Sequence, residues 1–381
     1  MKIAVSTRLL LHNKLDGIGW FTYESFKRIV QQHPEHEFHF LFDRKYSDEF
    51  IFSKNVIPHV IPPQARHPIL FRIWYDYMVP RALKKIGADV FISPGPLGSL
   101  RTDVPQLMVI HDLNFEHYPK GIPKVHSSYL RKNSPLLAKK AKRIATVSEF
   151  SKQDIHEQYK VPLDKIDVVY NGANENFHAL DEKIKFEVRM EYSGGEEYFV
   201  FVSSILPRKN LQRILPAFDR FKNSTESKIK LVVVGNKYWV SNEIESAYNE
   251  MQHKNDVIFT GRLDAVELHH VLASSLALVY VSYFEGFGIP IVEAFHCGVP
   301  VITSNMTSMP EVSGDAALLV NPFSVDEISG AMNSVYSDIS LRADLIAKGN
   351  VRMNNFSWQR TADLLWNSIE KLMDQTSSTR K

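Results

Sequence analysis

The sequence predicts an α/β protein made of doubly wound parallel sheets. Short apolar runs alternate with longer amphipathic stretches along most of the chain. Several of the runs are apolar on both faces, as in parallel strands that helices cover on both sides. The length of 381 residues fits two domains, or three. Repeated strand–helix units of this kind form doubly wound sheets.

The order of the elements follows from these two patterns. In the first half the apolar runs predict strands at Lys2–Ser6, Glu37–Phe42, Val56–Ile61, Val90–Ser93, Gln106–His111, Arg143–Val147 and Ile166–Val169. In the second half they predict strands at Tyr198–Val202, Lys230–Gly235, Val257–Thr260, Ala277–Val281, Val299–Ser304 and Ala317–Val320. The amphipathic stretches predict helices at Phe21–Gln32, Tyr75–Ile86, Tyr129–Lys142, Leu211–Lys222, Glu243–Lys254, Asp326–Tyr336 and Phe356–Met373.

A charged segment separates the two halves. Residues 178–197 are rich in Glu and Lys and contain Gly194-Gly195, and the alternation of strands and helices restarts at Tyr198. We therefore expect one domain at 1–185, a second at 186–355 and a C-terminal helix at 356–381. Two α/β domains of similar size imply a ligand cleft between them, at the carboxyl ends of their strands.

Composition excludes several classes of function. A formal net charge of +2 does not predict a large nucleic-acid footprint. The single cysteine, Cys297, excludes an internal disulfide and a cysteine-built metal site, and it fits a reducing compartment. No segment approaches the roughly 20 apolar residues that span a bilayer, and the N-terminus reads as a strand without a signal peptide. We expect a cytoplasmic protein, with peripheral contact at the inner face of the cell membrane left open.

The segment Tyr283–Glu293 is the most informative part of the sequence. Glu285 and Glu293 flank a turn that contains Gly286 and Gly288, and a helix is expected to begin near Pro290. The glycines let the backbone approach a ligand, and free N–H groups at a helix start favour negative charge. Carboxylates accept hydrogen bonds from hydroxyl pairs. The turn therefore suits a ligand with phosphates and hydroxyls, such as a nucleotide sugar; a solvated turn with an incidental acid is the alternative.

A pair of cations follows the first strand of the second half. Arg208 and Lys209 stand just before a predicted helix. Two cations and a helix N-terminus at one place suit an anion such as a diphosphate leaving group. An ordinary surface Arg-Lys pair is the alternative.

Two weaker signals lie in the first half. Gly17 and Gly19 follow the first strand but lack the third glycine of a dinucleotide fingerprint, which disfavours a nicotinamide fold and leaves a plain turn open. His111 and Asp112 end a strand, where open α/β sheets place ligand groups. His111 could bond a sugar hydroxyl, with Asp112 orienting it or capping the next helix; a structural histidine is the alternative.

The remaining charged residues form a basic stretch and show no metal-ligand pattern. The basic stretch 120–143 contains an amphipathic helix, which is either a solvated face or a contact for anionic membrane lipids. His269-His270 lacks carboxylates at metal-ligand spacing, and no Asp-x-Asp pair occurs. We expect no metal and no cofactor.

Together these motifs resemble a retaining glycosyltransferase of family 4, and the similarity extends over essentially the whole chain. The motifs that carry it are Gly17-Ile-Gly19, His111-Asp112, Thr146–Ser151, Val169–Gly172, Pro207–Asn210, Gly261–Leu263, Glu285–Glu293, Gly298–Val301 and Met309–Val312. The resemblance implies the GT-B fold: two Rossmann-like domains facing a central cleft, with a last helix that crosses back to the first domain.

The resemblance also implies roles for individual residues. The second domain would bind the nucleotide-sugar donor and the first the acceptor, a glycan or a lipid-linked molecule. The implied catalytic residues are His111, Arg208, Lys209 and Glu285. The implied donor-binding residues are Gly17, Gly19, Ser204, Arg208, Lys209, Gly261, Arg262, Leu263, Glu285, Gly286, Phe287, Gly288, Ile289 and Glu293.

Within this set the contacts differ. Arg208 and Lys209 would bind the diphosphate, and Glu293 the ribose diol. Glu285, with the N–H groups of Phe287 and Gly288, would bind the transferred sugar. Gly19 would approach the phosphates, His111 would contact the donor sugar, and residues 261–263 would border the base. Some relatives carry a further cation shortly before Pro207, where this chain has Ser203 and Ser204, which leaves the number of charges on the diphosphate open.

The resemblance favours transfer of a hexose in polysaccharide biosynthesis. The His-Asp and Pro-Arg-Lys-Asn forms resemble the branch that uses GDP-mannose. A UDP-sugar transferase, a nucleotide-sugar epimerase of the same fold and a non-catalytic sugar-binding protein stay open as alternatives.

Overall fold

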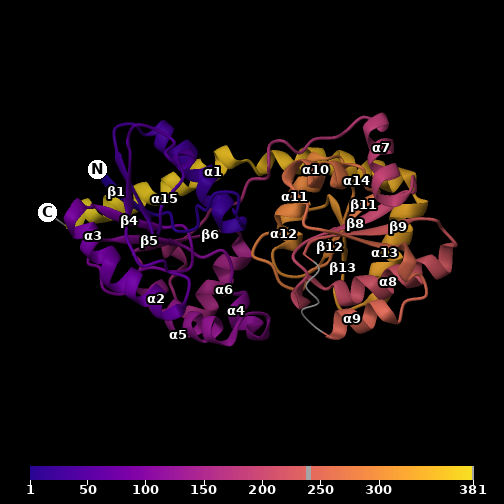
Figure 1. Cartoon of the computed structure of the whole chain (residues 1–381), viewed down its shortest axis with the longest axis horizontal. Coiled ribbons are helices and arrows are strands. Elements are labelled where there is room, and N and C mark those ends of the chain that lie inside the picture. Colours follow the sequence, from indigo (N-terminus) through magenta and orange to yellow (C-terminus); the bar gives the residue numbers. More distant parts are fainter. Residues whose placement is uncertain (237–241, 380–381) are drawn as a thin grey trace. The chain divides into compact units, whose positions relative to one another are not determined.

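The computed structural model describes residues 1–236 and 242–379, without the side chains of Lys120, Asn242 and residues 376–379. The chain forms two compact units, Met1–Asn171 with Trp358–Lys381 and Gly172–Ser357. Each unit contains one parallel sheet, so the predicted α/β class with two doubly wound sheets is confirmed (Figure 1).

The second unit begins before residue 185, the boundary expected from the sequence. Nε2 of His269 donates to the carbonyl oxygen of His178 at 2.7 Å, and it also lies 3.2 Å from the backbone nitrogen of His178. Helix α7 (Glu182–Ser193) packs against α10 (Ala265–Ala273). These contacts attach the linking segment to the second unit.

The first unit contains a seven-stranded sheet in the order β3-β2-β1-β4-β5-β6-β7. Its strands are β1 (Lys2–Ser6), β2 (Glu37–Phe42), β3 (Val56–Val60), β4 (Val90–Ser93), β5 (Gln106–Val109), β6 (Arg143–Thr146) and β7 (Ile166–Val168). Its helices are α1 (Gly17–Gln32), α2 (Pro68–Ile73), α3 (Val79–Ile86), α4 (Asn114–His117), α5 (Lys124–Lys140), α6 (Glu149–Tyr159) and α15 (Trp358–Thr379). Helix α1 begins four residues before the predicted start because the Asp16 carboxylate accepts from the N–H of Gly19 at 2.8 Å.

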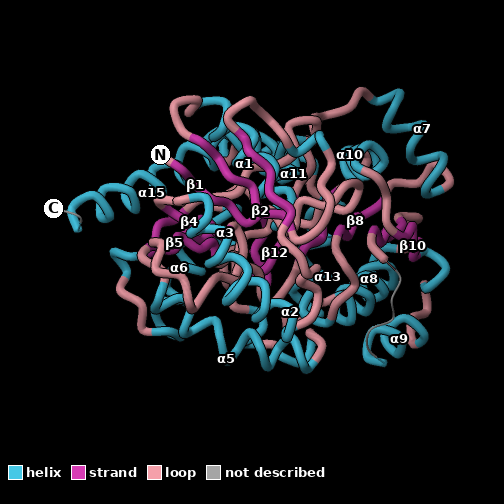
Figure 2. The backbone as a smooth tube through the Cα atoms, turned by 60° about the vertical axis from the view of Figure 1, so that its left-hand side comes forward, coloured by secondary structure: helices cyan, strands magenta, loops and turns pink. Residues whose placement is uncertain are grey.

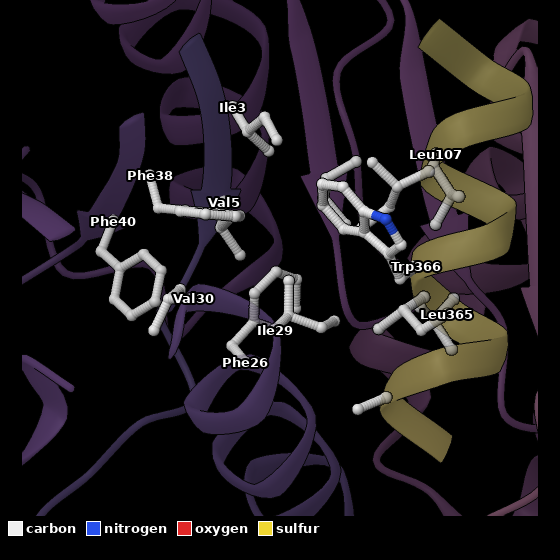
Figure 3. Packing of buried hydrophobic residues seen from close by; sticks show 14 of the residues in the cluster. Ile3, Val5, Phe26, Ile29, Val30, Phe38, Phe40, Leu107, Leu365 and Trp366 are labelled. Atoms are coloured by element: carbon white, nitrogen blue, oxygen red, sulfur yellow. The ribbon is translucent and has the colours of Figure 1, made fainter. Parts of the chain in front are cut away.

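Alternate residues of the central strands pack on opposite faces of this sheet, as the pleat requires. Ile3 and Val5 join a core with residues of α1 and α15, whereas Ala4 joins a second core with residues of α2 and α3. Figure 3 shows Leu365 and Trp366 of α15 in the first of these cores. The last helix of the chain is thus part of the first unit.

Asp167 at β7 holds α15 in place. Its carboxylate accepts from the guanidinium of Arg143 at 2.8 and 2.9 Å, from Oγ of Ser368 at 2.9 Å and from Nζ of Lys371 at 2.7 Å. Arg143 is buried, so Asp167 provides the counter-charge that a buried cation needs.

The second unit contains a six-stranded sheet in the order β10-β9-β8-β11-β12-β13. Its strands are β8 (Tyr198–Val202), β9 (Lys230–Val234), β10 (Val257–Gly261), β11 (Ala277–Tyr280), β12 (Val301–Ser304) and β13 (Ala317–Val320). The helices besides α7 and α10 are α8 (Leu211–Thr225), α9 (Asn242–Asn249), α11 (Ile289–His296), α12 (Met309–Ser313), α13 (Val325–Ser337) and α14 (Ile339–Arg352). Figure 1 shows α10, α11 and α14 on one side of this sheet and α8 and α9 on the other.

The chain order reverses at the same place in both sheets. In the first unit this switch point lies between β1 and β4, and in the second between β8 and β11. Loops that leave neighbouring strands in opposite directions open a crevice outside their carboxyl ends, where doubly wound proteins bind ligands. Each unit therefore has one preferred position for a site.

Candidate active site

The site of the second unit is built from the loops after β8 and β11, at the switch point. After β8 the chain makes a 3₁₀ turn, Pro207–Lys209, and enters α8 through Asn210, whose φ is +68°. After β11 the chain passes through Glu285 to Gly288 and then enters α11. The predicted cations and the first predicted glutamate thus come from neighbouring strand ends.

These three side chains form one ion-paired cluster. An oxygen of Glu285 lies 2.9 Å from Nη1 of Arg208, and its other oxygen pairs with Nζ of Lys209. Nζ of Lys209 also donates to the hydroxyl of Tyr280 at 3.0 Å, and Nη1 of Arg208 donates to the carbonyl of Phe284 at 3.0 Å. We call Arg208, Lys209 and Glu285 the charged triad. Two cations against one carboxylate leave it with a net positive charge.

The triad keeps Glu285 ionised despite its burial. Glu285 and Lys209 are both buried. Burial acts to raise the pKa of Glu285, but the charges of Lys209 and Arg208 outweigh it and lower that pKa to about 2. The carboxylate is therefore an acceptor at any physiological pH, and the two cations are held in fixed positions.

Three residues that the sequence did not assign a role support the triad. Nδ2 of the fully buried Asn210 donates to the carbonyls of Val281 at 3.0 Å and Pro322 at 2.6 Å, which ties the loops after β8, β11 and β13 together. The hydroxyl of Ser308 donates to the carbonyls of Glu285 and Phe287, both at 3.0 Å. Tyr280 lies under Lys209. Asn210 had one sequence signal, since Asn tolerates a positive φ; Ser308 and Tyr280 had none.

The start of α11 faces the same loop. Gly288 has φ +106°, and a Cβ there would lie 3.2 Å from Cδ1 of Ile291 and 3.3 Å from Met309, so glycine is required. Gly286, Phe287 and Gly288 are buried, and Ile289 is the first residue of the helix. The N-terminal amides of α11 therefore follow the triad directly and add positive potential for an anion.

Glu293 lies one turn into α11 and is partly buried. Burial raises its pKa to about 8. At neutral pH its carboxyl group is thus largely protonated, and it can both donate and accept hydrogen bonds. This fits a diol partner better than a charged one.

The predicted base-binding residues, 261–263, lie at the end of β10. β10 ends at Gly261, whose carbonyl accepts from the N–H of Gly235 at 2.9 Å. At Gly235, φ is +151° and a Cβ would lie 2.0 Å from the carbonyl oxygen of Ser203, so the loops after β8 and β9 approach more closely than any side chain permits. Arg262 and Ser204 are exposed and Leu263 is half-buried. Gly235 is a further residue that sequence reasoning missed.

Gly17, Gly19 and His111 lie in the first unit. Gly17 and Gly19 open α1, where the N–H of Gly19 is bonded to the carboxylate of Asp16. Nε2 of His111 lies 3.0 Å from the carbonyl of Pro94, and its ring meets Phe21 edge-on. A carbonyl only accepts, so Nε2 carries a proton. Burial lowers the pKa of His111, so the ring is neutral at pH 7 and Nδ1 is an acceptor.

The structure brings Arg208, Lys209, Glu285 and the start of α11 together, as predicted. Within the part of the chain that is described, no three His, Cys, Asp or Glu side chains are grouped as a metal would need. The described helices also include none long and apolar enough to cross a membrane.

The family models match both units. Residues 15–177 match the model described as Glycosyltransferase Family 4, and residues 183–352 match Glycosyl transferases group 1. The chain belongs to the family 4 glycosyltransferases. Membership favours sugar transfer over the epimerase and the sugar-binding protein that the sequence left open.

Relatives of this glycosyltransferase support the assignment. It is 27% identical to O-antigen chain mannosyltransferase B of Escherichia coli, over 98% of this chain and 100% of the relative. It is also 27% identical to O-antigen chain mannosyltransferase RfbU of Salmonella typhimurium, over 84% of this chain and 86% of the relative.

Solved structures share its fold. Sucrose-phosphate synthase from Thermosynechococcus elongatus matches with a TM-score of 0.77 at 14% identity, over 98% of this chain and 99% of that one. HepE from Anabaena, in complex with UDP-glucose, matches with a TM-score of 0.74 at 15% identity, over 97% and 100%. The predicted GT-B fold is confirmed.

Glu293 makes stability depend on pH. Its folded pKa of about 8 lies above the ordinary value of 4.5, so between these pH values the folded state binds a proton that the unfolded state has lost. Stability therefore falls as pH rises through this window. We expect Glu293→Gln to remove this loss, so that its free energy of unfolding rises by ~2–4 kcal/mol relative to that of wild type between pH 5 and pH 8. Urea unfolding at several pH values measures it.

Glu245→Gln, on the exposed side of α9, is the matched control. Its stability should follow wild type across the same range. Parallel profiles for wild type and Glu293→Gln would contradict the raised pKa.

Proposed function

We propose that this glycosyltransferase transfers mannose from GDP-mannose, with retention of configuration, to a glycan or lipid-linked acceptor in polysaccharide biosynthesis. The observation that carries the donor site is the charged triad at the switch point of the second unit, next to the start of α11. The choice of mannose is supported by the two O-antigen mannosyltransferases, which resemble this chain over most of their length.

The triad suits a diphosphate that becomes a leaving group. Its net positive charge and the amides of α11 converge on one place, where they can stabilise the negative charge that develops as the sugar–phosphate bond breaks. Glu285 holds Arg208 and Lys209 in position before a ligand arrives, so little reorganisation is needed during the reaction. We propose that these cations replace a divalent metal.

The other residues then have separate tasks. Glu285 and the N–H groups of Phe287 and Gly288 would hold sugar hydroxyls, and Glu293, protonated or ionised, would hold the ribose diol. Nδ1 of the neutral His111 would accept from a hydroxyl of the donor sugar. As the bond from sugar to phosphate breaks, the bond from sugar to acceptor oxygen forms on the same face, and the departing diphosphate takes the acceptor proton. Positioning and charge stabilisation supply the catalysis.

We further propose that the enzyme works in the cytoplasm and touches anionic membrane lipids through the first unit. Helices α2 and α5 lie side by side, joined by ring contacts of Phe71 with His126 and Tyr129 (Figure 2). The α2–α5 surface consists of the exposed Arg66, Ile69, Arg72, Ile73, Lys124 and Val125. Ile69 is 65% and Val125 56% exposed. Apolar side chains among cations, with no acid in residues 118–148, are typical of a membrane contact.

Variants of the triad test the donor site. Lys209→Met and Glu285→Gln keep side-chain volume but remove a charge that stabilises or positions the diphosphate. We expect each to lower transfer of labelled mannose to an extracted lipid-linked acceptor by roughly 10²–10³-fold. The exposed Lys228→Met serves as control and should keep wild-type turnover. Near-normal turnover in either folded triad variant would reject the role assigned here.

A thermal-shift panel of nucleoside diphosphates tests the donor. A ligand at 100 times its Kd stabilises a protein by about 2.7 kcal/mol, so GDP and GDP-mannose should raise Tm and UDP should not. Stabilisation by UDP alone would overturn the mannose assignment and leave the transferase intact.

Vesicle binding tests the α2–α5 surface. Each cation near an anionic surface contributes about 1 kcal/mol, so the double variant Arg72→Gln/Lys124→Gln should weaken binding to phosphatidylglycerol vesicles roughly 30-fold. The exposed pair Lys228→Gln/Lys254→Gln, in the second unit, provides the charge-matched control. Equal binding by both double variants would show that this surface is an ordinary solvated face.

A further inference from the structure

The first unit contains a cavity of about 440 Å³ at its own switch point. Ser6 at the end of β1 and Ser93 at the end of β4 form its floor, and residues of α1, α2 and α5 form its walls. Every lining residue belongs to this unit. The volume lies in the range of roughly 300–1,000 Å³ typical of small-molecule sites.

The walls of this cavity are mainly apolar. Its large apolar side chains are Leu9, Ile18, Phe71, Leu97, Ile122 and Leu130. A ligand that fills the cavity must therefore present an apolar surface to most of it.

The hydroxyl groups of the lining are engaged within the protein. Those of Ser6 and Tyr75 lie 3.1 Å apart and bond to each other. Thr22 donates to the carbonyl of Ile18 at 2.8 Å, and Ser93 donates to the carbonyl of Leu97. A bare sugar ring, which needs several hydrogen-bonding partners, would find few donors here.

Arg8 supplies the positive charge of the cavity, whose lining also contains the carboxylate of Asp16, an acceptor for the N–H of Gly19. Nη1 donates to the carbonyl of Ala65 at 3.0 Å, and the guanidinium lies 5.2 Å from the ring centre of Phe71. Its Nε is buried without a hydrogen-bond partner. No described carboxylate lies within ion-pair distance of this guanidinium. A guanidinium without an ion-pair partner favours a phosphate, which it can bind through two N–H groups.

The two helices of the α2–α5 surface also line the cavity. Phe71 of α2 and Ile122, Pro123 and His126 at the start of α5 line it, and Arg72 and Lys124 follow them in the sequence and are exposed. Figure 2 shows α2 and α5 next to each other. Lipid bound at that surface would therefore lie beside the helices that form the apolar walls of the cavity.

We propose that this cavity binds a lipid phosphate, with the phosphate on Arg8 and the first part of the chain against the apolar walls. Resting on the proposed function, this makes the acceptor a glycan carried on a lipid phosphate rather than a free glycan. The cavity recognises the carrier and leaves the sugar outside it.

Geranyl phosphate, below its micelle concentration, is the probe, and calorimetry measures its binding to the full chain without any donor. We expect geraniol and inorganic phosphate each to bind at least 10-fold more weakly than geranyl phosphate, because each lacks one half of the ligand. Arg8→Gln should lose at least 10-fold in affinity, Arg8→Lys should recover part of it, and Lys84→Gln, exposed on α3 and outside the cavity, should match wild type. If Arg8→Gln does not fold, Ile122→Gln tests the apolar wall instead.

Unchanged binding by folded Arg8→Gln, equally tight binding of inorganic phosphate, or displacement of the probe by a mannose disaccharide would each overturn the proposal. If phosphatidylglycerol vesicles displace geranyl phosphate, the cavity binds a lipid phosphate, and that phosphate belongs to a bulk membrane lipid. If the vesicles do not displace geranyl phosphate, the phosphate belongs to the lipid carrier of the acceptor. These measurements need no nucleotide sugar. Binding of geranyl phosphate without transferase activity would therefore reject the proposed function and leave the proposed cavity ligand intact. Transferase activity on a lipid-linked acceptor without binding of geranyl phosphate would reject the proposed cavity ligand and leave the proposed function intact.

Discussion

The site of the second unit depends on one buried carboxylate. Glu285 accepts from two cations that belong to the loop of a different strand, so a single side chain fixes both loops at the switch point. Removing Glu285 or its two cations would leave a buried charge without a counter-charge, which is strongly unfavourable. Asn210 and Ser308 bond the surrounding carbonyls and keep the loops at that spacing. The proposed donor site is therefore held in place before any ligand binds, as electrostatic catalysis requires.

The two sheets repeat one arrangement and use it for different chemistry. Both have the strand order that reverses between the first and fourth strands, and both have polar groups at that point. In the second unit the crevice holds net positive charge and helix N–H groups, which suit a diphosphate. In the first unit it is a mainly apolar cavity lined by the guanidinium of Arg8 and the carboxylate of Asp16, and we propose an amphipathic anion as its ligand. The difference lies in the loops, because the strands only set where a ligand can approach.

The strands could be predicted almost completely, and the helices and the site only in part. Each predicted strand is present, with ends that move by a residue or two, because runs such as Tyr198–Val202 are apolar on both faces. The start of α1 was missed because the capping of Asp16 depends on a local bond that periodicity does not report. Arg208, Lys209 and Glu285 were found through their motifs, but their mutual pairing was not, since 76 residues separate Lys209 from Glu285. Ser308 and Tyr280 had no pattern to reveal them.

By itself the sequence determined the α/β class, the family and the residue types of the proposed donor site. Periodicity and short motifs record these properties directly, because they depend on neighbours along the chain. Only the tertiary structure decided that Glu285 bridges both cations, that Glu293 is protonated near neutral pH, and that Arg8 lines a mainly apolar cavity without an ion-pair partner. Each of these properties depends on how deeply a side chain is buried and on which loops, distant in the sequence, lie next to each other. The order of the strands in the sheet places those loops together.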